Sequence, residues 1–168
     1  MALEQAALVA EIVSSTALMV SLIYVAVQVR QSNIAARLSA TRSLQSSIAN
    51  LEEAFIRDRD FARLLKMGLS GDIRQLDDID RIRLACHYRN SFRVYQAAHY
   101  HYRKGALDES IWLPERKCLA QILKVDAGMR EHFEIEKNLL DRDFITLCEE
   151  LMRDSDEAPF SFQSHAGS

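Results

Sequence analysis

The pattern of apolar and polar positions changes along the chain, and its first part is apolar on all sides. The stretch from Ile12 to Val29 holds 18 residues without a charge. A helix of this length spans roughly 27 Å, slightly less than a hydrocarbon core of about 30 Å. We therefore predict a transmembrane segment within residues 1–30; a buried helix of a bundle is the alternative. A cleaved signal peptide is disfavoured, because residues 1–11 contain no Lys or Arg.

Small and polar residues follow a stripe within this apolar segment. They recur at intervals of four and three, which places them on one side of a helix. The stripe consists of Ala10, Ser14, Ala17, Ser21, Tyr24 and Gln28. Small residues let membrane helices approach closely, and a polar Gln can bond across the interface. The stripe predicts a membrane-helix interface, either with a second copy or with another membrane protein. The alternative is a single helix whose hydroxyls bond back to its own carbonyls.

A one-sided helical pattern follows the apolar segment. Residues 30–58 contain no Gly or Pro, and apolar positions from Ile34 to Phe55 recur every three or four residues. The helix is therefore expected to continue as a stalk that ends near Asp58. Gln45 and Glu52 occupy positions where a coiled-coil seam needs apolar residues, so packing in a bundle is favoured.

Four further helical segments are expected before residue 154. A short one starts at Asp58 or Asp60 and ends at Gly68 or Gly71, and a long one begins near Asp77 or Asp78. Two more open at Asp108 and Asp126, the last running to the end of the periodic pattern. The expected buried positions are Leu84, Tyr88, Tyr95, Ala98, Tyr102, Met129, Phe133, Leu140, Phe144, Leu147 and Leu151. The prediction is an all-α fold: one transmembrane helix continuous with a stalk, then a cytoplasmic bundle of four or five helices in residues 31–153. Residues 154–168 are expected to form a flexible acidic tail.

Composition and charge limit the partners and the compartment. The net charge is −3, which argues against nucleic-acid binding. The three cysteines are widely spaced, which is typical of reduced thiols in the cytosol. Arg30, Arg37 and Arg42 follow the apolar segment and no basic residue precedes it. The positive-inside rule then places the N-terminus outside and the rest of the chain in the cytoplasm.

Several stretches resemble a largely uncharacterised family of small bacterial membrane-anchored proteins. They are "SLIYVAVQVRQSNIAAR", "LDDIDRIRL", "RNSFRVYQAAHYHYRKGALDESIW" and "DRDFITL". The most specific is the aromatic and basic helix followed by Gly105, Leu107, Asp108, Glu109 and Trp112. The resemblance implies a helical protein of the bacterial inner membrane and transfers no activity. The stretch "VDAGMREHFEIEK" departs from the family pattern, because it lacks an expected Trp.

One face of the long helix carries candidate ligand-binding residues. Arg89, Arg93, Gln96, Tyr100 and Arg103 share that face. One interpretation is a site for an anionic ligand or a lipid headgroup. The alternative is a solvated face that pairs with Asp and Glu residues of neighbouring helices. The aromatic residues around Gly105 are expected to be core packing.

Catalytic and metal-binding motifs are not apparent. His132 and Glu136 are spaced as an i, i+4 pair, which is more often an ordinary surface contact than a metal site. No phosphate-binding loop or nucleophile motif occurs, so we expect neither an enzyme nor a cofactor. The predicted function is a non-enzymatic, membrane-anchored interaction module that self-associates or serves as an accessory subunit of a membrane complex. Its expected partners are the lipid bilayer and itself or another membrane protein. The alternatives are a ligand- or anion-sensing domain and a small oligomeric pore.

Overall fold

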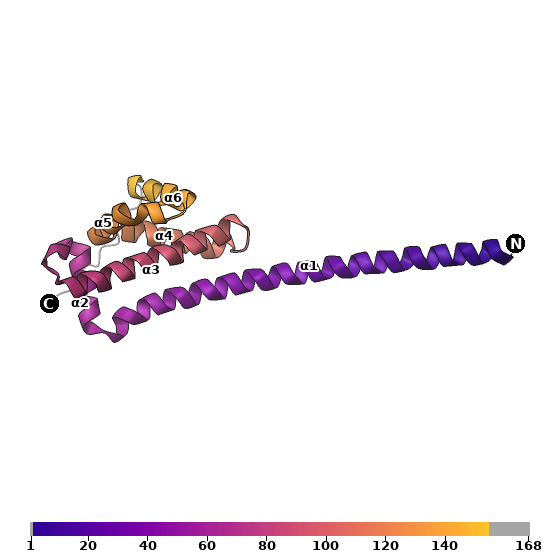
Figure 1. The fold of residues 1–168 in the computed structure, drawn as a ribbon, viewed down its shortest axis with the longest axis horizontal. Helices are drawn as coiled ribbons and strands as arrows, with labels where there is room; N and C mark the ends of the chain where they lie inside the picture. The colour runs from indigo at the N-terminus through magenta and orange to yellow at the C-terminus, as the bar shows by residue number, and fades with distance from the viewer. Residues whose placement is uncertain (1, 155–168) are drawn as a thin grey trace, which may run out of the picture. The chain divides into compact units, whose positions relative to one another are not determined.

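The computed structural model describes residues 2–154, without the side chains of residues 2–4, 6, 8, 9, 12, 13 and 55. Within that range every regular element is a helix, which confirms the all-α prediction (Figure 1). The α-helices are α1 (Ala2–Arg57), α2 (Arg59–Ser70), α3 (Asp78–Arg103), α4 (Glu109–Val125), α5 (Ala127–Glu136) and α6 (Arg142–Arg153). Two short 3₁₀ turns, η1 (Asp72–Gln75) and η2 (Lys137–Leu139), complete the elements.

The chain divides into two units, Met1–Ser39 and Ala40–Ser168. The first therefore extends beyond residue 30, where we expected the transmembrane segment to end. Helix α1 runs through the first unit and continues into the second, where it ends at Arg57, as the stalk prediction required. The predicted tail lies outside the described residues apart from Asp154, which follows the last residue of α6.

The first unit is a helix, and the apolar side chains that the structure describes on it are exposed on all sides. Leu18, Leu22 and Ile23 are each about two-thirds exposed. Among the residues that the structure describes, however, no helix is both long enough and apolar enough to cross a membrane. The described residues thus do not support the predicted transmembrane span. The uncharged stretch on which the prediction rests, Ile12 to Val29, includes Ile12 and Val13, whose side chains are not described.

Aspartate side chains fix where the helices of the second unit begin. Asp58, Asp77, Asp126 and Asp141 precede α2, α3, α5 and α6, and each accepts a hydrogen bond from a backbone N–H of the first turn. Such caps satisfy donors that have no partner within the helix, and the carboxylate also favours the positive end of the helix dipole. Of the two candidate caps for the short helix, Asp58 and not Asp60 is the cap, and Asp77 caps the long helix whose start was expected at Asp77 or Asp78.

The core of the second unit forms around α3, with α4, α5 and α6 packed to one side of it (Figure 1). Leu84, Tyr88, Tyr95 and Ala98 are buried as predicted, whereas Tyr102 is half-buried. The other predicted core positions are also buried, except for the half-buried Leu140. From α1, Leu44 joins this core, while Leu38 and Ile34 in the first unit are about half exposed.

The segment after Asp126 differs from the single helix that we expected. It forms α5 and α6, separated by η2 and by an extended Leu140. The physical reason is local, because Asp141 accepts a hydrogen bond from the backbone N–H of Asp143 and starts a new helix. Gly71, in the left-handed conformation at φ 78°, is the residue that ends α2. Pro114 lies in the second turn of α4.

Candidate functional site

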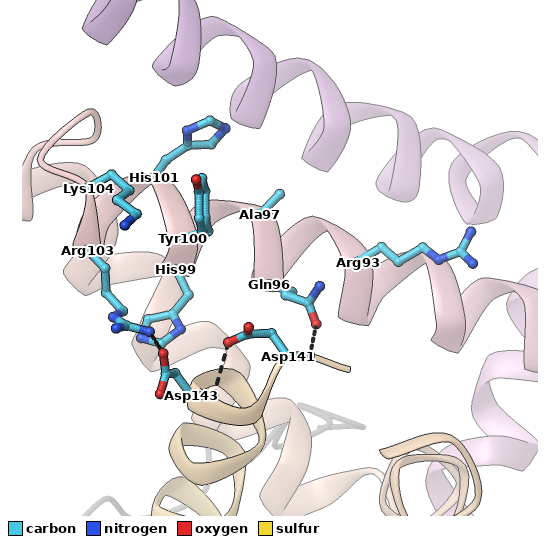
Figure 2. Close-up of a pocket in the computed structure, with 10 residues that line it drawn as sticks. All are labelled: Arg93, Gln96, Ala97, His99, Tyr100, His101, Arg103, Lys104, Asp141 and Asp143. Carbon is cyan, nitrogen blue, oxygen red and sulfur yellow. Dashed lines mark hydrogen bonds and ion pairs between the residues drawn. The ribbon is translucent and has the colours of Figure 1, made fainter. Parts of the chain in front are cut away.

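Four of the five predicted ligand-face residues line one pocket of the second unit. The pocket has a volume of about 590 Å³ and lies between the C-terminal half of α3 and the start of α6 (Figure 2). Arg93, Gln96, Tyr100 and Arg103 line it as expected. The remaining lining residues are Ala97, His99, His101, Lys104, Asp141 and Asp143. We refer to it below as the α3–α6 pocket.

Two polar contacts join the walls of this pocket. Gln96 Oε1 accepts a hydrogen bond of 2.8 Å from the backbone N–H of Asp141, and Arg103 forms an ion pair with Asp143 (Figure 2). Both contacts link α3 to the first residues of α6. The Gln96 bond therefore positions the Asp141 cap, while the Arg103 ion pair offsets part of the negative charge at the start of α6.

One lining residue of the pocket, His99, packs against aromatic residues of the core. Gly105, at φ 68°, ends α3, and the chain then turns so that Leu107 and Trp112 are buried. The His99 ring lies 5.5 Å from that of Trp112 and 6.1 Å from that of Phe144, measured between centroids. Burial lowers the pKa of His99, and the nearby Arg103 lowers it further. The imidazole is therefore uncharged at neutral pH and contributes no permanent positive charge.

The cations of the pocket differ in how far they are already engaged. Arg103 is paired with Asp143, and Lys104 Nζ lies 5.7 Å from the centroid of the exposed Tyr100 ring. Arg93 is exposed, extends along the outside of α3, and makes no ion pair or hydrogen bond with the described residues (Figure 2). The lining holds three cations against two carboxylates, and Arg93 and Lys104 are the cations that pair with no carboxylate among the described residues.

Arg89, the fifth predicted residue, lies outside this pocket. Its Nε donates to both carboxylate oxygens of Glu136 in α5 at 2.9 Å, and its terminal nitrogen contacts the same carboxylate. This hydrogen bonding lowers the pKa of Glu136. Arg89 therefore follows the alternative interpretation of the face, in which basic residues pair with acids of neighbouring helices, as does Arg103.

The pair of His132 and Glu136 is buried and is not the surface contact that we expected. His132 is 8 % exposed and Glu136 is 9 % exposed. His132 Nε2 lies 3.3 Å from Glu136 Oε2, but the geometry of that contact is not that of a hydrogen bond. Burial is the main cause that lowers the pKa of His132. Among the described residues, no group of three or more His, Cys, Asp or Glu side chains is placed to hold a metal ion.

The polar stripe of α1 bonds along its own helix. Ser14 Oγ donates to the Ala10 carbonyl and Ser21 Oγ to the Ala17 carbonyl, each at 2.8 Å. Gln28 Nε2 donates to the Tyr24 hydroxyl at 2.8 Å. This arrangement agrees with the alternative of a single helix whose hydroxyls bond back to their own carbonyls.

Sequence reasoning did not identify several pocket residues. Lys104 could have been predicted, because it follows Tyr100 by one helical turn and therefore lies on the predicted face. No sequence signal pointed to Asp141 and Asp143, because they enter the pocket only through the tertiary packing of α6 near α3.

Comparisons with protein-family models, with curated proteins and with solved structures give no significant match. The family resemblance therefore stays a prediction.

Proposed function

We propose that this protein is a membrane-anchored helical interaction module of the bacterial inner membrane, without enzymatic activity. One observation carries the proposal: a continuous run of large apolar side chains on α1 is exposed. Leu18, Met19, Val20, Leu22, Ile23, Tyr24, Val25, Val27 and Val29 are between 48 % and 69 % exposed. Removal of apolar surface from water stabilises by about 25 cal/mol per Å², so such a surface favours an apolar cover.

A lipid bilayer suits this surface better than a single protein partner. The exposed residues are nearly consecutive and therefore lie on all sides of the helix, whereas one partner helix covers one side. Arg30, Arg37 and Arg42 follow the run and would lie on the cytoplasmic side. The proposal also relies on Ile12 and Val13 as the first residues of the span, because the described part of α1 alone is insufficient to cross a membrane.

The anchor is tested by extraction of the full chain from bacterial membranes at alkaline pH. We expect the wild type to remain in the membrane pellet. Val20→Arg combined with Ile23→Arg should release the protein, because each Arg at the centre of a span costs about 2.5–3.5 kcal/mol. Leu139→Arg, at a 76 % exposed apolar residue of the second unit, is the matched control and should stay in the pellet. A wild type found in the soluble fraction would overturn the proposal.

The orientation is tested with the cysteines of the second unit. Cys86 and Cys118 are exposed on it. A membrane-impermeant maleimide should label them only after the inner membrane is broken, since the second unit is proposed to lie in the cytoplasm. Labelling in intact spheroplasts would reverse the proposed orientation.

Self-association through the stripe of Ala10, Ser14, Ala17, Ser21, Tyr24 and Gln28 is the proposed mode of assembly. The hydroxyls of Ser14 and Ser21 are bonded to carbonyls of their own helix, so the small side chains of the stripe stay available for close approach of a second helix. Crosslinking in bilayers should capture a dimer or larger oligomer, and Ser14→Leu with Ser21→Leu should abolish it. A chain that stays monomeric in bilayers would exclude both a homo-oligomer and a pore, and would leave the accessory-subunit role.

A second candidate function, anion sensing, is favoured by the unpaired Arg93 in the α3–α6 pocket. We propose that Arg93 binds a phosphate group there, carried by a lipid or free in solution. Inorganic phosphate and a short-chain phosphatidic acid should both raise the melting temperature of the wild type if free phosphate suffices. Only the lipid should do so if a headgroup is required. Arg93→Gln should remove the rise in melting temperature, whereas Arg63→Gln, at an exposed arginine of α2, should not.

A further inference from the structure

The α3–α6 pocket combines the cation Arg93 with an exposed aromatic ring two helical turns away. Tyr100 is 58 % exposed, lines the same pocket and follows Arg93 by seven residues on one face of α3. Seven residues of an α-helix correspond to a rise of about 10.5 Å. A phosphate at Arg93 and a ring packed on Tyr100 can therefore belong to one molecule of about the length of a mononucleotide.

The Tyr100 ring has room for a planar partner. Although Lys104 Nζ lies 5.7 Å from its centroid, more than half of the residue stays exposed. Ala97, which precedes Tyr100 by one helical turn in the pocket lining, adds only a methyl group (Figure 2). A nucleotide base stacks on such a ring through its flat π-face, whichever base it is.

Two polar groups at the middle of the same span suit a sugar. Gln96 Oε1 accepts from the backbone N–H of Asp141, so the amide is held in one orientation, and its Nε2 donates to no described residue. Asp141 Oδ1 accepts from the backbone N–H of Asp143, while its Oδ2 has no partner among the described residues. A carboxylate accepts hydrogen bonds from ribose hydroxyls in known nucleotide sites.

We propose that the α3–α6 pocket binds a nucleoside monophosphate. The phosphate lies at Arg93, a ribose hydroxyl donates to Asp141 Oδ2, and the base stacks on Tyr100. This inference rests on the anion sensing proposed above and names the class of the anion. A phospholipid headgroup such as phosphatidic acid has no planar ring for Tyr100, so the ligand is a soluble nucleotide.

Calorimetric titration of the full-length protein with adenosine 5′-monophosphate (AMP), ribose 5-phosphate and adenosine tests the proposal. AMP should bind saturably, and ribose 5-phosphate at least about fivefold more weakly, because it lacks the stacked base. Adenosine should bind at least about tenfold more weakly than AMP, because it lacks the charged partner of the arginine.

The three titrations separate the failure of this inference from the failure of anion sensing. Equal affinities for AMP and ribose 5-phosphate would overturn the nucleotide and leave anion sensing intact. Adenosine bound as tightly as AMP, or no binding of any of the three compounds, would overturn both.

Substitutions on α3 assign the base and the phosphate to their residues. Tyr100→Leu should lower AMP affinity to that of ribose 5-phosphate, whereas Tyr100→Phe keeps the ring and should bind AMP as the wild type does. Arg93→Gln should lower AMP affinity to that of adenosine, and the exposed Arg63→Gln is its matched control. The melting temperature of each variant without ligand shows that it is folded. AMP binding that Tyr100→Leu leaves unchanged would reject the site.

The ribose contact is tested without a substitution of Asp141, because this residue also caps α6. The 2′,3′-dideoxy form of AMP lacks both ribose hydroxyls and should bind about tenfold more weakly than AMP, since a hydrogen bond to a charged group is lost. Equal binding of the two nucleotides would overturn the assignment of the ribose to Asp141.

Discussion

Two helical stretches of this chain place similar apolar residues in opposite environments. In α1, Leu18 and Leu22 are about two-thirds exposed, whereas in α3, Leu84 and Phe92 are 1 % exposed. The difference lies in periodicity. In α3 the buried apolar residues recur on one side and face α4 and α5, but in residues 18–29 of α1 the exposed apolar residues occur on all sides. Hydrophobic content alone therefore does not make a core; the apolar residues must also gather on one side of the helix.

The largest effect should come from emptying the core of the second unit. Phe133 is 0 % exposed, and Phe133→Ala is expected to lower the free energy of unfolding by about 3–5 kcal/mol. Leu22→Ala removes a large apolar side chain from the first unit and should change it by less than about 0.5 kcal/mol. Urea unfolding followed by Trp112 fluorescence measures both. Equal losses would mean that the first unit is also part of the folded core.

A smaller effect tests the close approach of helices in that core. A Cβ at Gly68 would lie 2.1 Å from the Tyr88 hydroxyl, so Gly68→Ala should cost about 1–3 kcal/mol through overpacking. Tyr88→Phe removes the oxygen that the new methyl group meets. The double variant should therefore be more stable than the sum of the single effects predicts, by at least about 0.5 kcal/mol. Strict additivity in urea melts would show that the core accommodates the added methyl group in another way.

Features that depend on local sequence could be predicted, whereas features that depend on tertiary packing could not. Asp58 and Asp77 mark helix starts through local chemistry, and both act as caps. The buried face of α3 followed from its period, since Leu84, Tyr88, Tyr95 and Ala98 occur at helical spacing. The α3–α6 pocket was predicted only from its α3 side. The partners Asp141 and Asp143 come from a helix start some forty residues later, and no local signal brings them to Gln96 and Arg103.

Local signals were also ambiguous where two interpretations share one pattern. Arg89 and Arg93 lie one turn apart on the same face, yet only Arg89 meets an acid on α5. The spacing of His132 and Glu136 is common on helix surfaces, and burial came from the packing of α5 against α2 and α3. Which acid lies opposite a helix face is decided by tertiary packing, and periodicity carries no information about it.

Acidification should weaken the second unit through three histidines, of which His132 is buried and His87 and His99 are half-buried. Burial is the main cause that lowers the pKa values of His87, His99 and His132 from 6.5. The unfolded chain therefore binds protons first as the pH falls, so stability is full above pH 6.5 and declines below it. The wild type should melt at a lower temperature at pH 5.5 than at pH 7.5, and His132→Gln should show a smaller decline. An unchanged decline would mean that His132 is not held in its neutral form.

The smallest effect compares one kind of hydrogen bond in the two units. Ser21 in α1 and Ser91 in α3 each donate from Oγ to the carbonyl four residues earlier, at 2.8 Å and 2.9 Å. Ser21 is exposed, but Ser91 is 7 % exposed. Ser91→Ala removes a buried hydrogen bond and should cost about 1 kcal/mol.

Ser21→Ala should change the free energy of unfolding by less than about 0.5 kcal/mol, because Ala is the better helix former and no buried group loses its partner. Urea melts of the two variants against the wild type give the comparison directly. A cost at Ser21 that matches the cost at Ser91 would mean that the Ser21 hydroxyl is buried in the assembled protein. That result would favour a helix–helix interface at the stripe over a single helix surrounded by lipid.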